Sequence, residues 1–181
     1  MRTILHRHPD SACEAVAAIA VEIERTGSGG LTLRYLVTAT PDRLVVPPPA
    51  EPVRVDGLWR HTCFEAFVRA PGVQPYAELN LAPSGQWAAY AFDGYRQAMR
   101  PAELAAPPAI AWVAHPDGFE LTAGLDLSVL APSGAWRIGL SAVIEEAGGR
   151  TSYWALAHPP GKADFHHDDG FALTLSGPPP Q

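Results

Sequence analysis

Residues 58–70 read LWRHTCFEAFVRA, and residues 76–92 read YAELNLAPSGQWAAYAF. Apolar side chains recur at alternate positions in both stretches, and successive side chains of a β-strand point to opposite faces of its sheet. The pattern therefore predicts adjacent strands with one apolar face and one face that carries polar and ionisable groups. The second face holds Trp59, His61, Cys63, Glu65 and Phe67 from the first stretch and Tyr76, Glu78 and Asn80 from the second.

Two carboxylates on this face need a compensating partner. An antiparallel pairing with its turn at residues 70–75 places Glu65 opposite Glu78 and Cys63 opposite Asn80. Like charges directly opposite each other in a β-ladder are unfavourable. We therefore expect a proton, an arginine, a metal or a ligand beside the pair.

The same alternation continues along most of the chain. Nineteen prolines and sixteen glycines provide the frequent turns that many short strands require. About ten strands without long helical periodicity predict an all-β fold, a two-sheet β-sandwich of jelly-roll type. We expect this single domain to span residues 1–176, followed by a proline-rich tail at 177–181.

The apolar positions of the remaining strands predict the core. Residues 19–24 and 31–38 alternate around a glycine-rich turn and predict a hairpin, as do residues 110–114 and 119–127. Two stretches break the pattern. Residues 43–46 predict a short strand stopped by the following prolines, and residues 95–100 predict one helical turn before Pro101.

Composition and charge exclude several classes of partner. The chain has 181 residues, a net charge of −6 and no cluster of Lys and Arg, so we expect no nucleic-acid partner. No run approaches the roughly 20 apolar residues of a membrane span. Acidic residues flank the apolar run at 15–21, unlike in a signal peptide, so we expect a cytoplasmic protein.

Five motifs follow one another in a characteristic order. They are LWRHTCFEAFV (58–68), YAELNLAPSGQWAAYAF (76–92), GFELTAGLDLSVL (118–130), WRIGLSAVI (136–144) and YWALAHPPGKADFHHDDGFALTL (153–175). The set resembles the DOMON-like superfamily, which includes the fold of carbohydrate-binding module family 9, and is similar to its stand-alone bacterial type. The resemblance implies a two-sheet β-sandwich that binds a sugar or a haem and is not a catalyst.

A small, sugar-like molecule is the ligand that the polar face fits best. Trp59 offers a ring for stacking, and nearby carboxylates and amides offer hydrogen-bond partners for hydroxyl groups. Arginines such as Arg60 and Arg96 are suited to hold an anionic group by bidentate hydrogen bonds. We expect no catalytic residue and no cofactor. The expected ligand-binding residues are Trp59, Arg60, His61, Glu65, Tyr76, Glu78, Asn80, Arg96, Trp154 and His166.

Two other functions remain open at this point. Glu65 and Glu78 resemble the carboxyl pair of a glycoside hydrolase, which retaining enzymes hold roughly 5 Å apart. A haem-binding redox module would need axial ligands, and Met99 together with a histidine would be the candidates. Residues 164–169, DFHHDD, are the densest group of potential metal ligands. Their spacing matches no standard metal site, so we expect a loop in which Asp164 and His166 satisfy backbone groups.

Overall fold

The computed structural model describes residues 1–131 and 134–177. Its twelve β-strands form one hydrogen-bonded sheet, and no α-helix occurs among the described residues. The strands are β1 (Arg2–Arg7), β2 (Val16–Thr26), β3 (Gly30–Ala39), β4 (Cys63–Arg69), β5 (Tyr76–Leu81), β6 (Trp87–Phe92), β7 (Arg100–Pro101), β8 (Ala109–His115), β9 (Gly118–Asp126), β10 (Trp136–Glu145), β11 (Thr151–Ala155) and β12 (Leu173–Leu175). Three short 3₁₀ turns complete the elements: η1 (Pro41–Arg43), η2 (Leu58–Arg60) and η3 (Asp168–Gly170).

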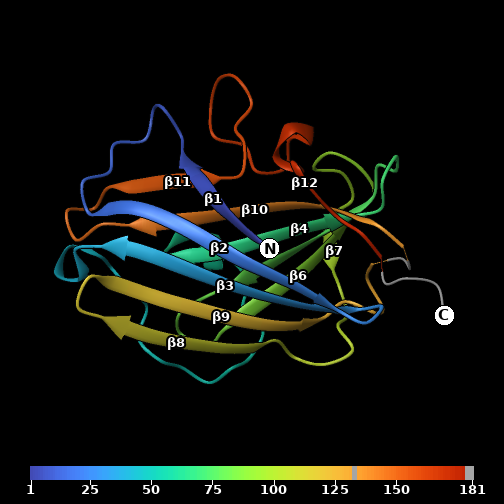
Figure 1. The fold of residues 1–181 in the computed structure, drawn as a ribbon, viewed down its shortest axis with the longest axis horizontal. Coiled ribbons are helices and arrows are strands. Elements are labelled where there is room, and N and C mark those ends of the chain that lie inside the picture. Colours follow the sequence, from blue (N-terminus) through green and yellow to red (C-terminus); the bar gives the residue numbers. More distant parts are fainter. Residues whose placement is uncertain (132–133, 178–181) are drawn as a thin grey trace.

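The sheet is continuous, with the order β7-β6-β5-β4-β10-β11-β1-β2-β3-β9-β8, and β12 pairs with β10. It curls so that β2, β3 and β9 lie in front of β4 and β6 (Figure 1). The sheet has two halves, one formed by β2, β3, β9 and β8 and the other by β7, β6, β5, β4, β10 and β11. β1 joins them, because Arg2–Leu5 pair with β2 while His6 and Arg7 pair with β11. The all-β prediction is confirmed. The two predicted sheets are instead halves of one sheet, since β1 hydrogen-bonds to both.

One hydrophobic core fills the space between the halves. The ring of Tyr35 on β3 lies 4.7 Å from that of Phe64 on β4, and its hydroxyl donates to the backbone oxygen of Glu65 at 2.9 Å. The predicted apolar faces supply the rest of this core. They include Ile19, Val21, Ile23, Leu31, Leu33, Val37, Ala66, Val68, Leu79, Leu81, Phe119, Leu121, Ala123, Leu125, Leu127, Trp136, Ile138, Leu140, Ala142 and Ile144.

The register between β4 and β5 differs from the predicted one by two residues. Glu65 pairs with Asn80, and Phe67 pairs with Glu78. A shift of two keeps every side chain on its face, so the predicted faces hold although the predicted partners are wrong. β4 ends at Arg69, directly before the predicted turn, and the buried side chain of Arg69 pairs with Asp168.

Both stretches that interrupt the alternation differ from their predictions. Residues 41–43 form η1 and only Leu44 makes a β-bridge, so the strand predicted at 43–46 is absent. The helical turn predicted at 95–100 is also absent. Gly94 and Gln97 form a β-bridge around a tight turn, and Arg96 within it and Ala98 just after it adopt left-handed backbone angles, with φ of 53° and 52°. The predicted tail at 177–181 lies outside the described residues except for Gly177.

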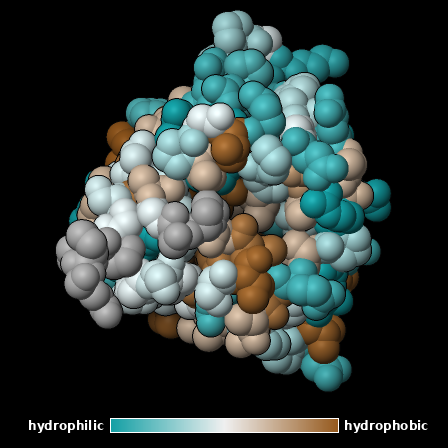
Figure 2. Space-filling model, turned by 90° about the vertical axis from the view of Figure 1, so that its right-hand side faces the viewer, coloured by the Kyte–Doolittle hydropathy of each residue, from teal (hydrophilic) through white to brown (hydrophobic). Residues whose placement is uncertain are grey.

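No helix among the described residues is long and apolar enough to cross a membrane. The face at the right-hand end of the sheet is largely hydrophilic in its upper part, with several hydrophobic residues gathered near its centre (Figure 2).

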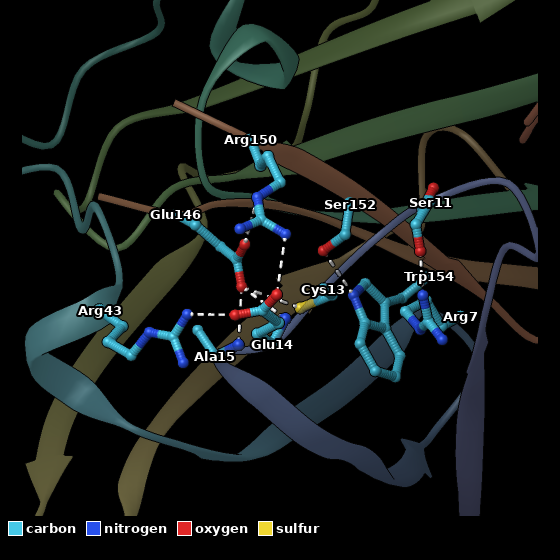
Figure 3. Close-up of polar contacts among 10 residues, drawn as sticks. All are labelled: Arg7, Ser11, Cys13, Glu14, Ala15, Arg43, Glu146, Arg150, Ser152 and Trp154. Carbon is cyan, nitrogen blue, oxygen red and sulfur yellow. Dashed lines mark hydrogen bonds and ion pairs between the residues drawn. The ribbon is translucent and has the colours of Figure 1, made fainter. Parts of the chain in front are cut away.

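A buried carboxylate fastens the loop between β1 and β2 to the end of β10 (Figure 3). Glu146 Oε1 accepts the backbone N–H groups of Glu14 and Ala15 at 2.8 and 2.6 Å, and the Cys13 thiol donates to it at 3.4 Å. Burial raises the pKa of Glu146, but these hydrogen bonds outweigh it and the net shift is downward. Arg150 lies beside both Glu146 and Glu14.

We expect Glu146→Ala to lower the free energy of unfolding by about 1–3 kcal/mol, because it leaves buried N–H donors without an acceptor. The lowered pKa means that the carboxylate's contribution is present above its unfolded pKa of about 4.5 and is lost as pH falls through the folded pKa. Urea titrations at pH 7 and below pH 4 measure this difference. Glu103→Ala, on an exposed loop, is the control. An equal loss in both variants would contradict the role of Glu146.

Candidate functional site

A pocket of about 880 Å³ lies on the face of the sheet opposite the core, over β6, β5, β4, β10 and β11. Residues 56–60, 96–101 and 163–166 contribute its walls. Strand alternation explains the floor, since residues such as Glu65 and Val143 lie between neighbours that face the core. The floor residues are Glu65, Glu78, Tyr90, Phe92, Val143 and Tyr153.

The part of the floor on β4 and β5 is buried because the chain after β11 folds back over this face. Phe171 lies 6.2 Å from the ring of Phe67 and 5.6 Å from that of Tyr76, which in turn stacks on Phe92 at 4.6 Å. Every residue of β4 and β5 is therefore buried. The polar face that the sequence predicts is thus enclosed, which makes its charged groups costly unless they are neutralised or paired.

Glu65 and Glu78 are almost completely buried, with 3% and 5% of their residue surface exposed. Ser141 Oγ donates to Glu65 Oε2 at 2.9 Å, and Asn80 Nδ2 donates to Glu78 Oε1 at 2.6 Å. Burial and the nearby Glu78 raise the pKa of Glu65 to about 8, and burial also raises the pKa of Glu78. The pair is therefore partly protonated near neutral pH, which supplies the compensation that the sequence requires.

His166 connects this pair to the loop at 96. The backbone N–H of Arg96 donates to the Tyr76 hydroxyl at 3.2 Å, and that hydroxyl lies 2.8 Å from His166 Nδ1. Because burial lowers the pKa of His166 to about 4, the ring is neutral at pH 7. The hydroxyl and Nδ1 share one hydrogen bond, whose direction depends on the tautomer of the ring. The other ring nitrogen, Nε2, faces Glu78 Oε2 at 3.7 Å.

An ion pair locks two walls of the pocket together. Arg96 donates to Asp164 Oδ1 at 2.8 Å, and the hydroxyl of Tyr95 donates to Asp164 Oδ2. Asp164 Oδ1 also accepts the backbone N–H of His166 at 3.1 Å, as predicted, whereas the ring of His166 hydrogen-bonds to the Tyr76 hydroxyl and, among the described residues, to no backbone group. The left-handed backbone of Arg96 is held in place by these contacts.

Aromatic and polar side chains frame the mouth. Trp59 is 49% exposed, and the guanidinium of Arg60 lies 5.2 Å from its ring centre. Trp59 lies in η2 rather than on a strand, so its predicted register with Glu65 is wrong. The hydroxyl of Tyr90 on the floor donates to Asp56 Oδ1 in the wall segment 56–60, at 2.6 Å.

The pocket brings together most of the predicted site residues. Tyr76 and Asn80 lie behind it and hold His166 and Glu78. His61 lies outside it, 2.9 Å from Glu145. Trp154 packs in the core on the other face, where its indole nitrogen donates to Ser152. The predicted residues that line the pocket are Trp59, Arg60, Glu65, Glu78, Arg96 and His166.

Sequence reasoning missed several pocket residues. Tyr153 lines the floor in place of its neighbour Trp154, because alternation on β11 turns one of them to each face. Tyr90 and Phe92 share a face with Ala88, and the pairing of Glu78 with Tyr90 brings them to the carboxylates. The sequence does carry a signal for them, because the alternating pattern from Glu78 continues through the hairpin between β5 and β6.

The surroundings of His166 suit neither a metal ion nor a haem. No group of three or more His, Cys, Asp or Glu side chains placed to hold a metal occurs in the described residues. Met99 and His166 do line the same pocket, as a haem with two axial ligands would need. However, Tyr76 holds one ring nitrogen of His166 and the other faces Glu78, so neither is directed into open space.

No protein-family model and no curated protein matches the chain. Solved structures do match it. A "putative carbohydrate-binding protein" from Bacteroides uniformis ATCC 8492 has a TM-score of 0.66 at 16% identity, over 97% of this chain and 85% of that one. A carbohydrate-binding module family 9 (CBM9) from Caldicellulosiruptor kristjanssonii, in complex with cellotriose, has a TM-score of 0.54 at 11% identity, over 89% and 74%.

The chain has a CBM9-like fold. Because the sequence identities are only 16% and 11%, the similarity to both structures shows a shared fold and nothing more. The wider DOMON-like assignment stays a prediction.

We expect Glu65→Gln to change how stability depends on pH. A folded pKa of about 8 against about 4.5 means that the folded protein holds a proton that the unfolded chain releases, so stability falls as pH rises through this window. Glutamine stays neutral at every pH. Between pH 5 and 9 the wild type should therefore lose free energy of unfolding on the order of a few kcal/mol that the variant keeps. Thermal unfolding across this range measures the effect, with exposed Glu24→Gln as control. Parallel profiles for wild type and Glu65→Gln would refute the raised pKa.

Proposed function

We propose that this protein is a non-catalytic binding protein for a carbohydrate. The observation that carries the proposal is the pocket of about 880 Å³, in which aromatic rings and hydrogen-bonding groups face the same space. Sugars have apolar ring faces that stack on aromatic side chains and hydroxyl groups that need polar partners.

The chemistry of the lining supports this ligand class. Trp59 at the mouth and Tyr153 on the floor offer rings, and Asp56, Glu65 and Glu78 offer oxygen acceptors. The pocket is about the size that small-molecule sites occupy, 300–1,000 Å³. The CBM9 module that shares this fold was solved with cellotriose, which supports an oligosaccharide or a smaller sugar as the ligand here.

Calorimetric titration with neutral and amino mono- and oligosaccharides tests the proposal. We expect at least one sugar to bind, and Trp59→Ala to weaken that binding about tenfold, or about 1.4 kcal/mol, through loss of its ring. Val113→Ala on β8, an exposed apolar residue far from the pocket in the strand order, is the matched control. If no sugar binds at millimolar concentration, or if Trp59→Ala leaves binding intact, the proposed site is wrong.

A glycoside hydrolase is the second candidate, because two carboxyl groups with raised pKa line one pocket. General acid catalysis by a carboxyl group requires such a raised pKa. Both groups, however, are almost completely buried at the floor and are held by Ser141 and Asn80. We expect no turnover of chromogenic aryl glycosides. Hydrolysis that is lost in both Glu65→Gln and Glu78→Gln would assign the protein to this second class.

A further inference from the structure

We propose that the carboxyl pair at the pocket floor binds the ammonium group of an amino sugar. The inference rests on the proposed carbohydrate-binding function and specifies its ligand class. The two groups concerned are Glu65 on β4 and Glu78 on the neighbouring strand β5. Both line the pocket, and both are more than nine-tenths buried.

The first argument is that the pair lacks a positive partner within the protein. In the described part of the chain, no lysine or arginine nitrogen lies within 4.0 Å of either carboxylate. His166 is the ionisable base beside Glu78, and burial keeps it neutral. A buried carboxylate without a countercharge is costly, so a cation that enters the pocket gains Coulomb energy that water would otherwise screen.

The second argument is that each carboxyl group has an oxygen available to the pocket. Ser141 occupies Glu65 Oε2, and among the described residues no donor reaches Glu65 Oε1. Asn80 occupies Glu78 Oε1, which leaves Oε2 beside His166. An ammonium group carries three N–H donors, which suits it to a site that offers such free oxygens.

Arg96 cannot serve as the missing cation in the arrangement observed. Its guanidinium donates to Asp164, and the same aspartate accepts from Tyr95 and from the backbone of His166. Moving Arg96 to the carboxylates would break this lock between the two walls. Its charge still lowers the pKa values of Glu65 and Glu78, but from a distance.

Aromatic rings on the floor add to the preference for a cation. Tyr90, Phe92 and Tyr153 line the pocket together with the carboxylates. Faces of aromatic rings attract cations, and aromatic cages are a known way of recognising ammonium groups. The same rings stack against the apolar faces of a sugar. An amino sugar therefore satisfies the rings and the carboxylates at once, whereas a neutral sugar satisfies only the rings and part of the polar groups.

The test compares amino sugars with their neutral counterparts at pH 6.5. The probes are glucosamine and 6-amino-6-deoxyglucose, with glucose and N-acetylglucosamine as neutral controls. We expect at least one amino sugar to bind the wild type about tenfold more tightly than either neutral sugar. We expect Glu78→Gln to abolish this preference, so that the amino sugar and glucose bind the variant with equal affinity. Added salt should weaken amino-sugar binding more than glucose binding.

Glu145→Gln provides the matched control, since Glu145 lies on β10 outside the pocket and pairs with His61. It should keep the preference. Circular dichroism and thermal melting confirm folding, and Glu65→Gln replaces Glu78→Gln if the latter does not fold. Equal or tighter binding of glucose overturns the inference and leaves the proposed function standing. A preference that survives in both pocket variants also overturns it. Binding of no sugar at all overturns the proposed function as well.

Discussion

The burial of both faces of β4 and β5 is the constraint on which the rest of the structure depends. One face packs in the core through residues such as Phe64 and Leu79, and the other is covered by the chain around Phe171. A strand between two apolar layers has no solvent face for its polar side chains. Glu65 and Glu78 therefore sit where ionisation is unfavourable, and their raised pKa values follow from that position.

The closure of the sheet by β1 sets the shape around this constraint. β1 pairs with β2 along its first part and with β11 at its end, so the front and back halves in Figure 1 belong to one sheet. The curl places Tyr35 of one half against Phe64 of the other. It also frees the outer face of β4, β5 and β6 for the loops that build the pocket. The buried Glu146 fastens the β1–β2 loop to the end of β10 and so supports the same closure (Figure 3).

The pocket itself is assembled from segments that are distant in the chain. Residues 56–60, 96–101 and 163–166 meet over the sheet, and the contact of Asp164 with Arg96 holds two of them together. Long-range contacts of this kind leave no periodic signal in the sequence. Tyr153 was missed for this reason, because only the position of β11 beside β10 decides which of its faces meets the pocket.

Alternation by itself determined the all-β class, the core faces and the common face of Glu65 and Glu78, because the side-chain period of a strand is a local property of the backbone. It did not determine the register of β4 on β5. A shift of two residues preserves every face, and the buried Arg69 at the end of β4 is held by the distant Asp168. Tertiary structure alone decided that β1 joins the halves, that Trp154 belongs to the core, and that no lysine or arginine among the described residues pairs with Glu65 or Glu78. Each of these three features depends on which distant segments of the chain meet. The local pattern of polar and apolar residues does not depend on the partner of a segment, so it cannot specify that partner.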